Sequence, residues 1–82
     1  RRVLFRSENL AATTPGDALT GPALRGDAAT VEGNLRALRV SLPDAVPAYV
    51  AATGAALDLA VRSGHLDDDG RRRVEEVLAR WR

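Results

Sequence analysis

The stretch from Asp44 to Ser63 limits most strongly how this chain folds, because it is apolar almost all round when drawn as a helix. Beyond its first turn only Asp58 and Arg62 are charged. Its apolar side chains form two stripes: Val46, Val50, Leu57 and Val61, and Ala45, Ala48, Ala52, Ala56 and Leu59. A helix that is apolar on every side is normally buried on every side. The stretch therefore predicts a central helix that Gly64 ends.

A second helix is predicted over about residues 28–40. Asp27 is a favourable N-cap, because its carboxylate can accept hydrogen bonds from the free amides of the first turn. The apolar residues that follow recur at spacings of three and four: Ala28, Val31, Leu35, Leu38 and Leu42. Glu32 and Arg36 lie four residues apart on the opposite side, an order that favours an ion pair. Pro43 ends the segment, because the residue before a proline avoids the helical conformation.

A third helix is predicted over about residues 68–81. Its apolar residues are spaced for one helical face: Val74, Val77, Leu78 and Trp81. Asp67, Asp68 and Asp69 complement the dipole at its beginning. Its other face carries charges four residues apart: Asp69 with Arg73, and Glu76 with Arg80. The three segments together predict an all-α fold, a small bundle of three main helices.

The first seven residues, RRVLFRS, are similar to the translation of a sequencing-library adaptor. The alternative is a native β-like segment, Val3–Phe5. If residues 1–7 are not native, residues 8–82 form a single helical domain that is truncated on its N-terminal side. Removing three of the 12 basic residues leaves nine against 11 acidic ones. A basic footprint is then absent, so we expect no nucleic-acid partner.

Composition excludes several kinds of site. The chain has no cysteine and one histidine, so neither a thiolate nor a histidine cluster can bind a metal ion. We find no apolar run that approaches the roughly 20 residues of a bilayer span, and no secretory signal. With its balanced charge, we expect a cytoplasmic protein without a membrane contact.

The residues before the first predicted helix are the main candidates for binding. Thr20, Gly21, Arg25 and Gly26 lead into the cap residue Asp27. A glycine-containing loop at a helix entrance points amides at an anion, and the forked guanidinium of Arg25 suits carboxylate or phosphate. The alternative is a tight turn with a surface arginine, which the spacing alone favours.

Two further polar residues stand out. Asn34 lies off the apolar stripe, so it faces either solvent or a cleft, and the sequence alone favours solvent. His65 follows the predicted cap Gly64 and is expected in an exposed loop.

The stretch Leu19–Leu38 resembles the C-terminal helical domain of a Rossmann-like protein family. That domain is catalogued only as a domain of unknown function. Its pattern is matched by Leu19-Thr20-Gly21-Pro22, Arg25-Gly26-Asp27, Thr30-Val31 and Leu35, and more loosely by Pro47–Ala60. The family is similar, at a distance, to ketopantoate reductase, pyrroline-carboxylate reductase and 6-phosphogluconate dehydrogenase.

The resemblance implies the C-terminal part of an oxidoreductase. In such proteins an N-terminal Rossmann domain holds NAD(P), and the helical domain packs on it and closes the substrate cleft. This chain contains no such nucleotide domain, so it would not be active alone. Thr20 and Arg25 are the residues expected to face the cleft. Family members often carry histidine where this chain has Asn34, so the resemblance does not carry a proton-transfer role over to this position.

The expected partners are the missing Rossmann domain and a second copy of the chain, bound through the middle helix. We expect the chain alone to expose part of that helix, either its Val46, Val50 and Leu57 face or its Ala52 and Ala56 face. The alternative function is a small helical interaction or dimerisation module without catalytic activity. A strand followed by Gly-x-Gly-x-x-Gly upstream would favour the oxidoreductase.

Overall fold

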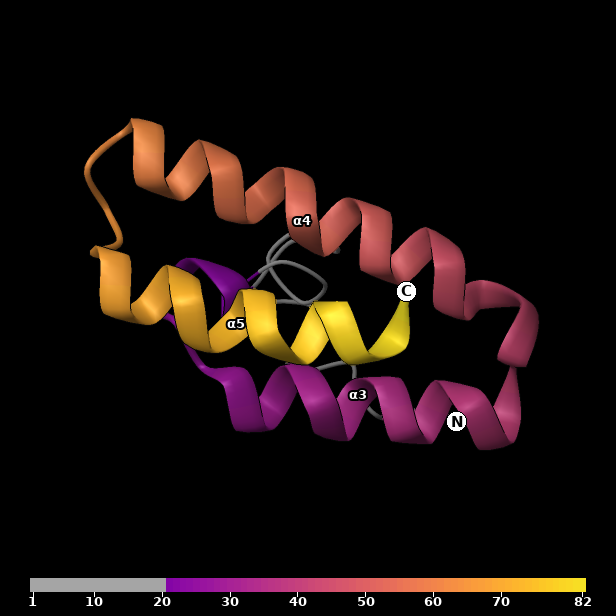
Figure 1. Cartoon of the computed structure of the whole chain (residues 1–82). Helices are drawn as coiled ribbons and strands as arrows, with labels where there is room; N and C mark the ends of the chain where they lie inside the picture. Colours follow the sequence, from indigo (N-terminus) through magenta and orange to yellow (C-terminus); the bar gives the residue numbers. More distant parts are fainter. Residues whose placement is uncertain (1–20) are drawn as a thin grey trace, which may run out of the picture.

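The computed structural model describes residues 21–82 of the chain. They form α3 (Ala28–Ser41), the short 3-10 helix η1 (Pro43–Ala45), α4 (Val46–Arg62) and α5 (Asp68–Trp81), and no strand lies among these residues. Figure 1 shows α4 running opposite to α3 and α5, with α5 packed against both. The predicted all-α bundle of three main helices is confirmed. Residues 1–20, which include the adaptor-like segment and Thr20, lie outside the described part.

Local capping explains where the helices begin and end. Asp27 and Asp67 each accept a hydrogen bond from the amide three residues ahead, at 3.1 and 2.8 Å. Pro43 follows α3 and opens η1. Gly64 has φ +80°, and the amide of His65 beyond it donates to the carbonyl of Ala60 at 2.9 Å. A glycine in this conformation ends a helix without strain. The caps and stops expected from the sequence are thus the ones that form.

One face from each helix builds the core. The side chains buried in this cluster are Val31, Leu35, Tyr49, Val50, Leu57, Val74, Val77 and Leu78. Trp81 packs against its edge, and the guanidinium of Arg39 lies 4.8 Å from the centre of the indole ring. The helical spacing of apolar residues therefore identified the packed faces of α3 and α5, except at Leu42, which lies just beyond α3 and keeps 57% of its surface.

The expectation that α4 is buried on all sides is wrong. Val50 and Leu57 are buried, whereas Ala48, Ala51, Ala52 and Ala55 are exposed and Leu59 keeps 58% of its surface. Of the main helices within residues 21–82, only α3 and α5 pack against α4, and they cover one side of it. Of the two faces expected to be exposed, Val50 and Leu57 belong to the core, and Ala52 belongs to the open side.

The expectation that no apolar run approaches the length of a bilayer span is also wrong, because the segment Pro43–Arg62 has that length. It has 20 residues and a mean hydropathy of 1.2, enough to cross a membrane by length and composition. The core helix of a soluble bundle meets the same test. Here five side chains of α4 are buried in the bundle: Tyr49, Val50, Thr53, Leu57 and Ala60.

Ion pairs on the surface differ in part from those predicted. Glu32 approaches Arg36 at 3.7 Å as expected, but it also accepts a 2.8 Å hydrogen bond from Arg80 of α5. That bond holds the pKa of Glu32 below its usual value. Arg80 is therefore engaged between helices rather than with Glu76. Asp69 pairs with Arg72, three residues ahead, in place of Arg73.

Candidate functional site

The candidate site begins at a short helical turn, residues 21–24, which ends at Gly26. Gly26 has φ +68°, and its amide donates to the carbonyl of Ala23 at 3.1 Å. The amide of Asp27 donates to the carbonyl of Pro22 at 2.8 Å. These two bonds form the usual C-terminal cap of a helix that ends in glycine. The chain therefore passes from this turn into α3 through three residues, Arg25, Gly26 and Asp27.

This cap agrees with the tight turn and surface arginine that the spacing favoured, and not with amides of Gly26 and Asp27 that point at an anion. Both amides are already bonded, and the amide of Ala28 donates to the carbonyl of Gly26 at 3.1 Å. The carboxylate of Asp27 itself occupies the beginning of α3. Its Oδ1 accepts from the amide of Thr30 at 3.1 Å, and its Oδ2 accepts from the Thr30 hydroxyl at 2.7 Å. The helix entrance is thus closed by the chain's own anion.

The same bonds set the charge state of Asp27. The hydroxyl and amide of Thr30 lower the pKa of Asp27 from its ordinary 3.8, and the charge of nearby Arg25 acts in the same direction. A carboxylate that accepts hydrogen bonds is stabilised in its charged form. Asp27 is therefore a structural cap, as predicted.

Gly26 is also a contact between the turn and α5. A Cβ added at this position would lie 3.1 Å from the Cα of Gly70 and 3.1 Å from Cδ1 of Leu66. The main chain around Gly26 thus lies close to the first turn of α5. Its role in the described residues is conformation and packing, and its amide has no part in binding.

Arg25 remains the best-placed binding group of the predicted set. Its side chain is exposed and forms no ion pair within residues 21–82. A Cβ added to the buried Gly21 would lie 3.0 Å from Nη1 of Arg25, so the guanidinium packs against Gly21. A side chain at position 21 would displace it. Gly21 therefore gives Arg25 room, whereas the position of Thr20 falls outside the described residues.

Asn34 does not face solvent, which the sequence had favoured. It is half-buried, and its Nδ2 donates a 3.0 Å hydrogen bond to the hydroxyl of Tyr49 on α4. Tyr49 is 6% exposed. The pair connects α3 with α4, and Asn34 lies apart from the residues that surround Arg25.

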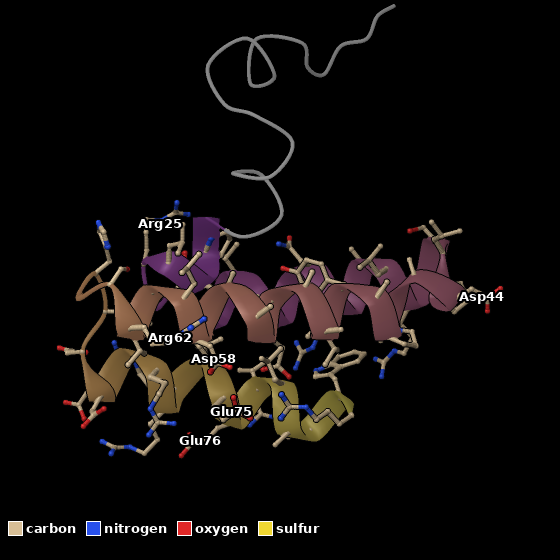
Figure 2. All side chains as sticks on the ribbon, turned by 90° about the horizontal axis from the view of Figure 1, so that it is seen from above. Arg25, Asp44, Asp58, Arg62, Glu75 and Glu76 are labelled. Atoms are coloured by element: carbon tan, nitrogen blue, oxygen red, sulfur yellow. The ribbon has the colours of Figure 1, made fainter. Side chains whose placement is uncertain are left out.

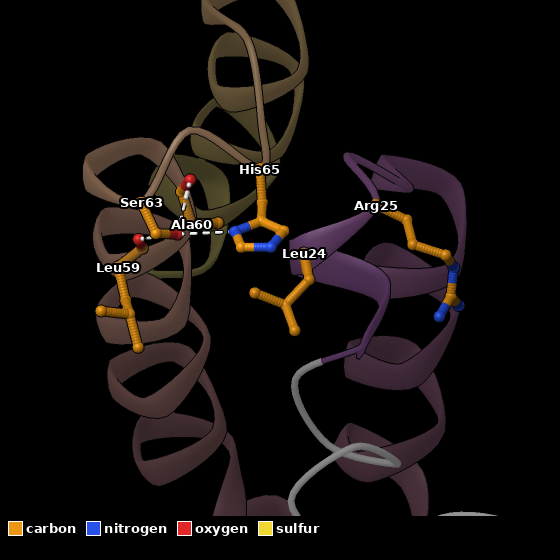
Figure 3. Close-up of a pocket in the computed structure, with 6 residues that line it drawn as sticks. All are labelled: Leu24, Arg25, Leu59, Ala60, Ser63 and His65. Atoms are coloured by element: carbon orange, nitrogen blue, oxygen red, sulfur yellow. Dashed lines mark hydrogen bonds between the residues drawn. The ribbon is translucent and has the colours of Figure 1, made fainter.

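Sequence reasoning missed the pocket beside Arg25. This open depression of about 420 Å³ lies between the turn and the end of α4, and it is lined by Leu24, Arg25, Leu59, Ala60, Ser63 and His65. In Figure 3 the side chain of Leu24 lies beside the His65 ring on the side of Arg25, while Arg25 extends away from His65 at the rim. Its wall is mostly apolar, and its polar groups are few.

His65 is exposed as predicted, but its ring is held in place. Its Nδ1 lies 2.8 Å from the hydroxyl of Ser63. That hydroxyl has one proton, and it approaches the carbonyls of Leu59 at 2.9 Å and Ala60 at 3.3 Å, which can only accept. The tautomer of the imidazole decides whether His65 or Ser63 donates in this bond, and Nε2 of His65 lies outside it. Gly64 is the sequence signal that could have predicted this position of His65, because the cap that a glycine forms at a helix end also bonds the amide of the next residue.

No metal site accompanies the pocket. No group of three or more histidine or acidic side chains that could hold a metal ion occurs within the described residues 21–82. The groups available for chemistry are the guanidinium of Arg25, the imidazole of His65 with the Ser63 hydroxyl bonded to it, and the apolar wall. Such a set can bind an acidic molecule.

The chain matches one protein-family model, described as "Domain of unknown function (DUF2520)", over residues 5–56. The chain belongs to this family. The match includes the turn, Arg25, all of α3 and the first part of α4, whereas α5 lies beyond it. No curated protein and no solved structure matches the chain.

Proposed function

We propose that this chain is the C-terminal helical domain of a Rossmann-like NAD(P)-dependent oxidoreductase, and that it supplies one wall of the substrate cleft. The dinucleotide is held mainly by an N-terminal Rossmann domain that is not part of this chain. The 82 residues alone are then inactive. The proposal rests on the resemblance around Leu19–Leu38 together with the chemistry at one end of the bundle.

Arg25 is the observation that carries the proposal. It is an exposed guanidinium without an ion pair among residues 21–82, and it stands at the rim of an open pocket with an apolar wall. An exposed cation beside an apolar surface suits a small acid, because the apolar part contacts the wall while the acid group bonds the guanidinium.

The described residues do not suit the dinucleotide itself. Pyrophosphate binding at a helix entrance needs several free amides, and here the amides of Gly26, Asp27, Ala28 and Thr30 are bonded within the chain. We therefore assign to Arg25 the acidic end of the substrate, a carboxylate or phosphate. Thr20 stays a candidate for the same cleft.

The test uses the protein from the complete reading frame, with inorganic phosphate and acetate as probes of the two acid groups. Arg25→Ala should weaken binding of the preferred probe about ten- to a hundred-fold, the effect of one charge-assisted hydrogen bond. Arg25→Lys should recover part of it, because lysine keeps the charge but lacks the planar fork.

The matched control is Arg36→Ala, an exposed arginine on α3 that does not line the pocket. It should leave the affinity unchanged. Equal losses of probe affinity in Arg25→Ala and Arg36→Ala would contradict a specific contact with Arg25. The same holds if Arg25→Ala unfolds part of the protein while the folded remainder binds the probe as tightly as the wild type.

The second candidate function is a helical interaction module without catalytic activity. The exposed apolar side of α4 favours it, because contiguous exposed apolar surface marks interaction sites. The upstream sequence separates the two functions, since only the oxidoreductase requires a strand and a glycine-rich turn before this domain.

A further inference from the structure

The outer side of α4 is an apolar surface with no partner among residues 21–82. Four of its alanines are exposed together with Leu59, which retains 58% of its surface. These residues lie opposite Val50 and Leu57, which face the core. Figure 2 views the bundle from the α4 side, with Asp44 at one end of the segment and Asp58 and Arg62 toward the other.

The spacing along this outer side is that of a coiled-coil seam. Six exposed residues, the first in η1 and the others in α4, recur at alternating steps of four and three: Asp44, Ala48, Ala51, Ala55, Asp58 and Arg62. This is the a and d repeat by which two helices pack along each other. The distance between packed helices depends on the side chains at the contact, so alanines at the centre allow a close approach.

The two ends of the seam carry opposite charges. Asp44 and Arg62 form no ion pair within the described residues. If two copies of α4 pair in opposite directions, each Asp44 meets the Arg62 of the other copy. A twofold axis makes this contact twice. Parallel pairing would instead place Asp44 against Asp44 and Arg62 against Arg62.

We propose that α4 binds a second copy of this chain through an antiparallel contact along this seam. Ala51 faces Ala55 of the second copy at the centre, Ala48 faces its Asp58, and Asp44 faces its Arg62. Asp58 lies one turn before Arg62 on the same helix, so each Arg62 lies between two carboxylates, one from each copy. The contact does not depend on the proposed oxidoreductase function.

The first test is sedimentation of the 82-residue chain over a range of concentrations. The chain should form a dimer whose fraction rises with concentration. Ala55→Glu should make it monomeric, because each copy would then place a glutamate in the central alanine layer. Only small side chains fit there, and the two like charges would lie close together. Ala37→Glu, an exposed alanine on α3, is the matched control and should leave the dimer intact. Far-UV circular dichroism should show both variants folded.

The second test exchanges the charges at the ends of the seam. Asp44→Arg and Arg62→Asp should each weaken the dimer about 2- to 30-fold, the range for two exposed ion pairs. The variant that carries both substitutions should regain much of the affinity, because each end of the seam then meets the opposite charge on the second copy again. Such rescue is expected only for antiparallel pairing.

Three results would overturn the proposal. The first is a wild-type chain that stays monomeric at NMR concentrations, including a monomer that binds lipid vesicles instead. The second is a dimer that Ala55→Glu and Ala37→Glu affect equally. The third is a double charge variant that is weaker than both single variants.

Discussion

Three glycine-to-alanine substitutions measure how tightly the turn before α3 packs against α5. Gly26 and Gly64 both have positive φ, +68° and +80°. A Cβ at Gly64 meets nothing within 4 Å, whereas at Gly26 it lies 3.1 Å from the main chain of Gly70. Gly33 lies inside α3 with open space around it. The three positions thus separate backbone strain, packing and helix propensity.

Each magnitude follows from one of these terms. Gly64→Ala should lower the free energy of unfolding by about 1–2 kcal/mol, the cost of a left-handed conformation with a side chain. Gly26→Ala should lose the same amount plus about 1–3 kcal/mol for overpacking. Gly33→Ala should gain about 0.5–1 kcal/mol, because alanine is the better helix former.

The assay is urea unfolding followed by far-UV circular dichroism. The difference between Gly26→Ala and Gly64→Ala isolates the contact between the turn and α5, since both variants share the backbone term. Equal losses at the two positions would show that the turn does not lie against α5. A loss at Gly33 would contradict its place on an open face of α3.

Two further predictions concern the bonds between and within helices. Tyr49→Phe should lower the free energy of unfolding by about 0.5–1.5 kcal/mol, because the Tyr49 hydroxyl accepts a hydrogen bond from Asn34. The loss should be much smaller when Asn34→Ala is already present. Additive losses in this double-mutant cycle would contradict the bond. The lowered pKa of Asp27 means that its carboxylate stabilises the fold above the ordinary value of 3.8 and that this stability is lost as the pH falls through the lower folded value. Asp27→Asn should therefore be less stable than the wild type at neutral pH, with a gap that shrinks in acid, and a gap independent of pH between neutrality and strong acid would contradict the capping role.

Helix boundaries could be predicted from the sequence because their causes are local. Asp27, Pro43, Gly64 and Asp67 act on residues within one helical turn, so their effects do not depend on the rest of the fold. The packed faces of α3 and α5 followed from spacing for the same reason.

The candidate site was harder to predict, because it depends on what lies beside each residue. Asn34 faces α4, and Glu32 faces Arg80 across 48 residues of sequence. The spacing favoured a tight turn over free amides at Gly26, but it could not predict the pocket beside Arg25, because His65 and Leu59 lie far from Arg25 in sequence. The open side of α4 follows from having only two neighbouring helices among the described residues, a fact of the assembled bundle.

Dinucleotide binding by the protein of the complete reading frame tests the central claim most directly. NADH and NADPH are titrated, with nicotinamide fluorescence as the signal, into that protein and into the 82-residue chain in parallel. We expect saturable binding of at least one dinucleotide by the complete protein and none by the chain alone. A complete protein that is folded, as judged by circular dichroism, and binds neither dinucleotide would contradict the assignment of this helical domain to an oxidoreductase.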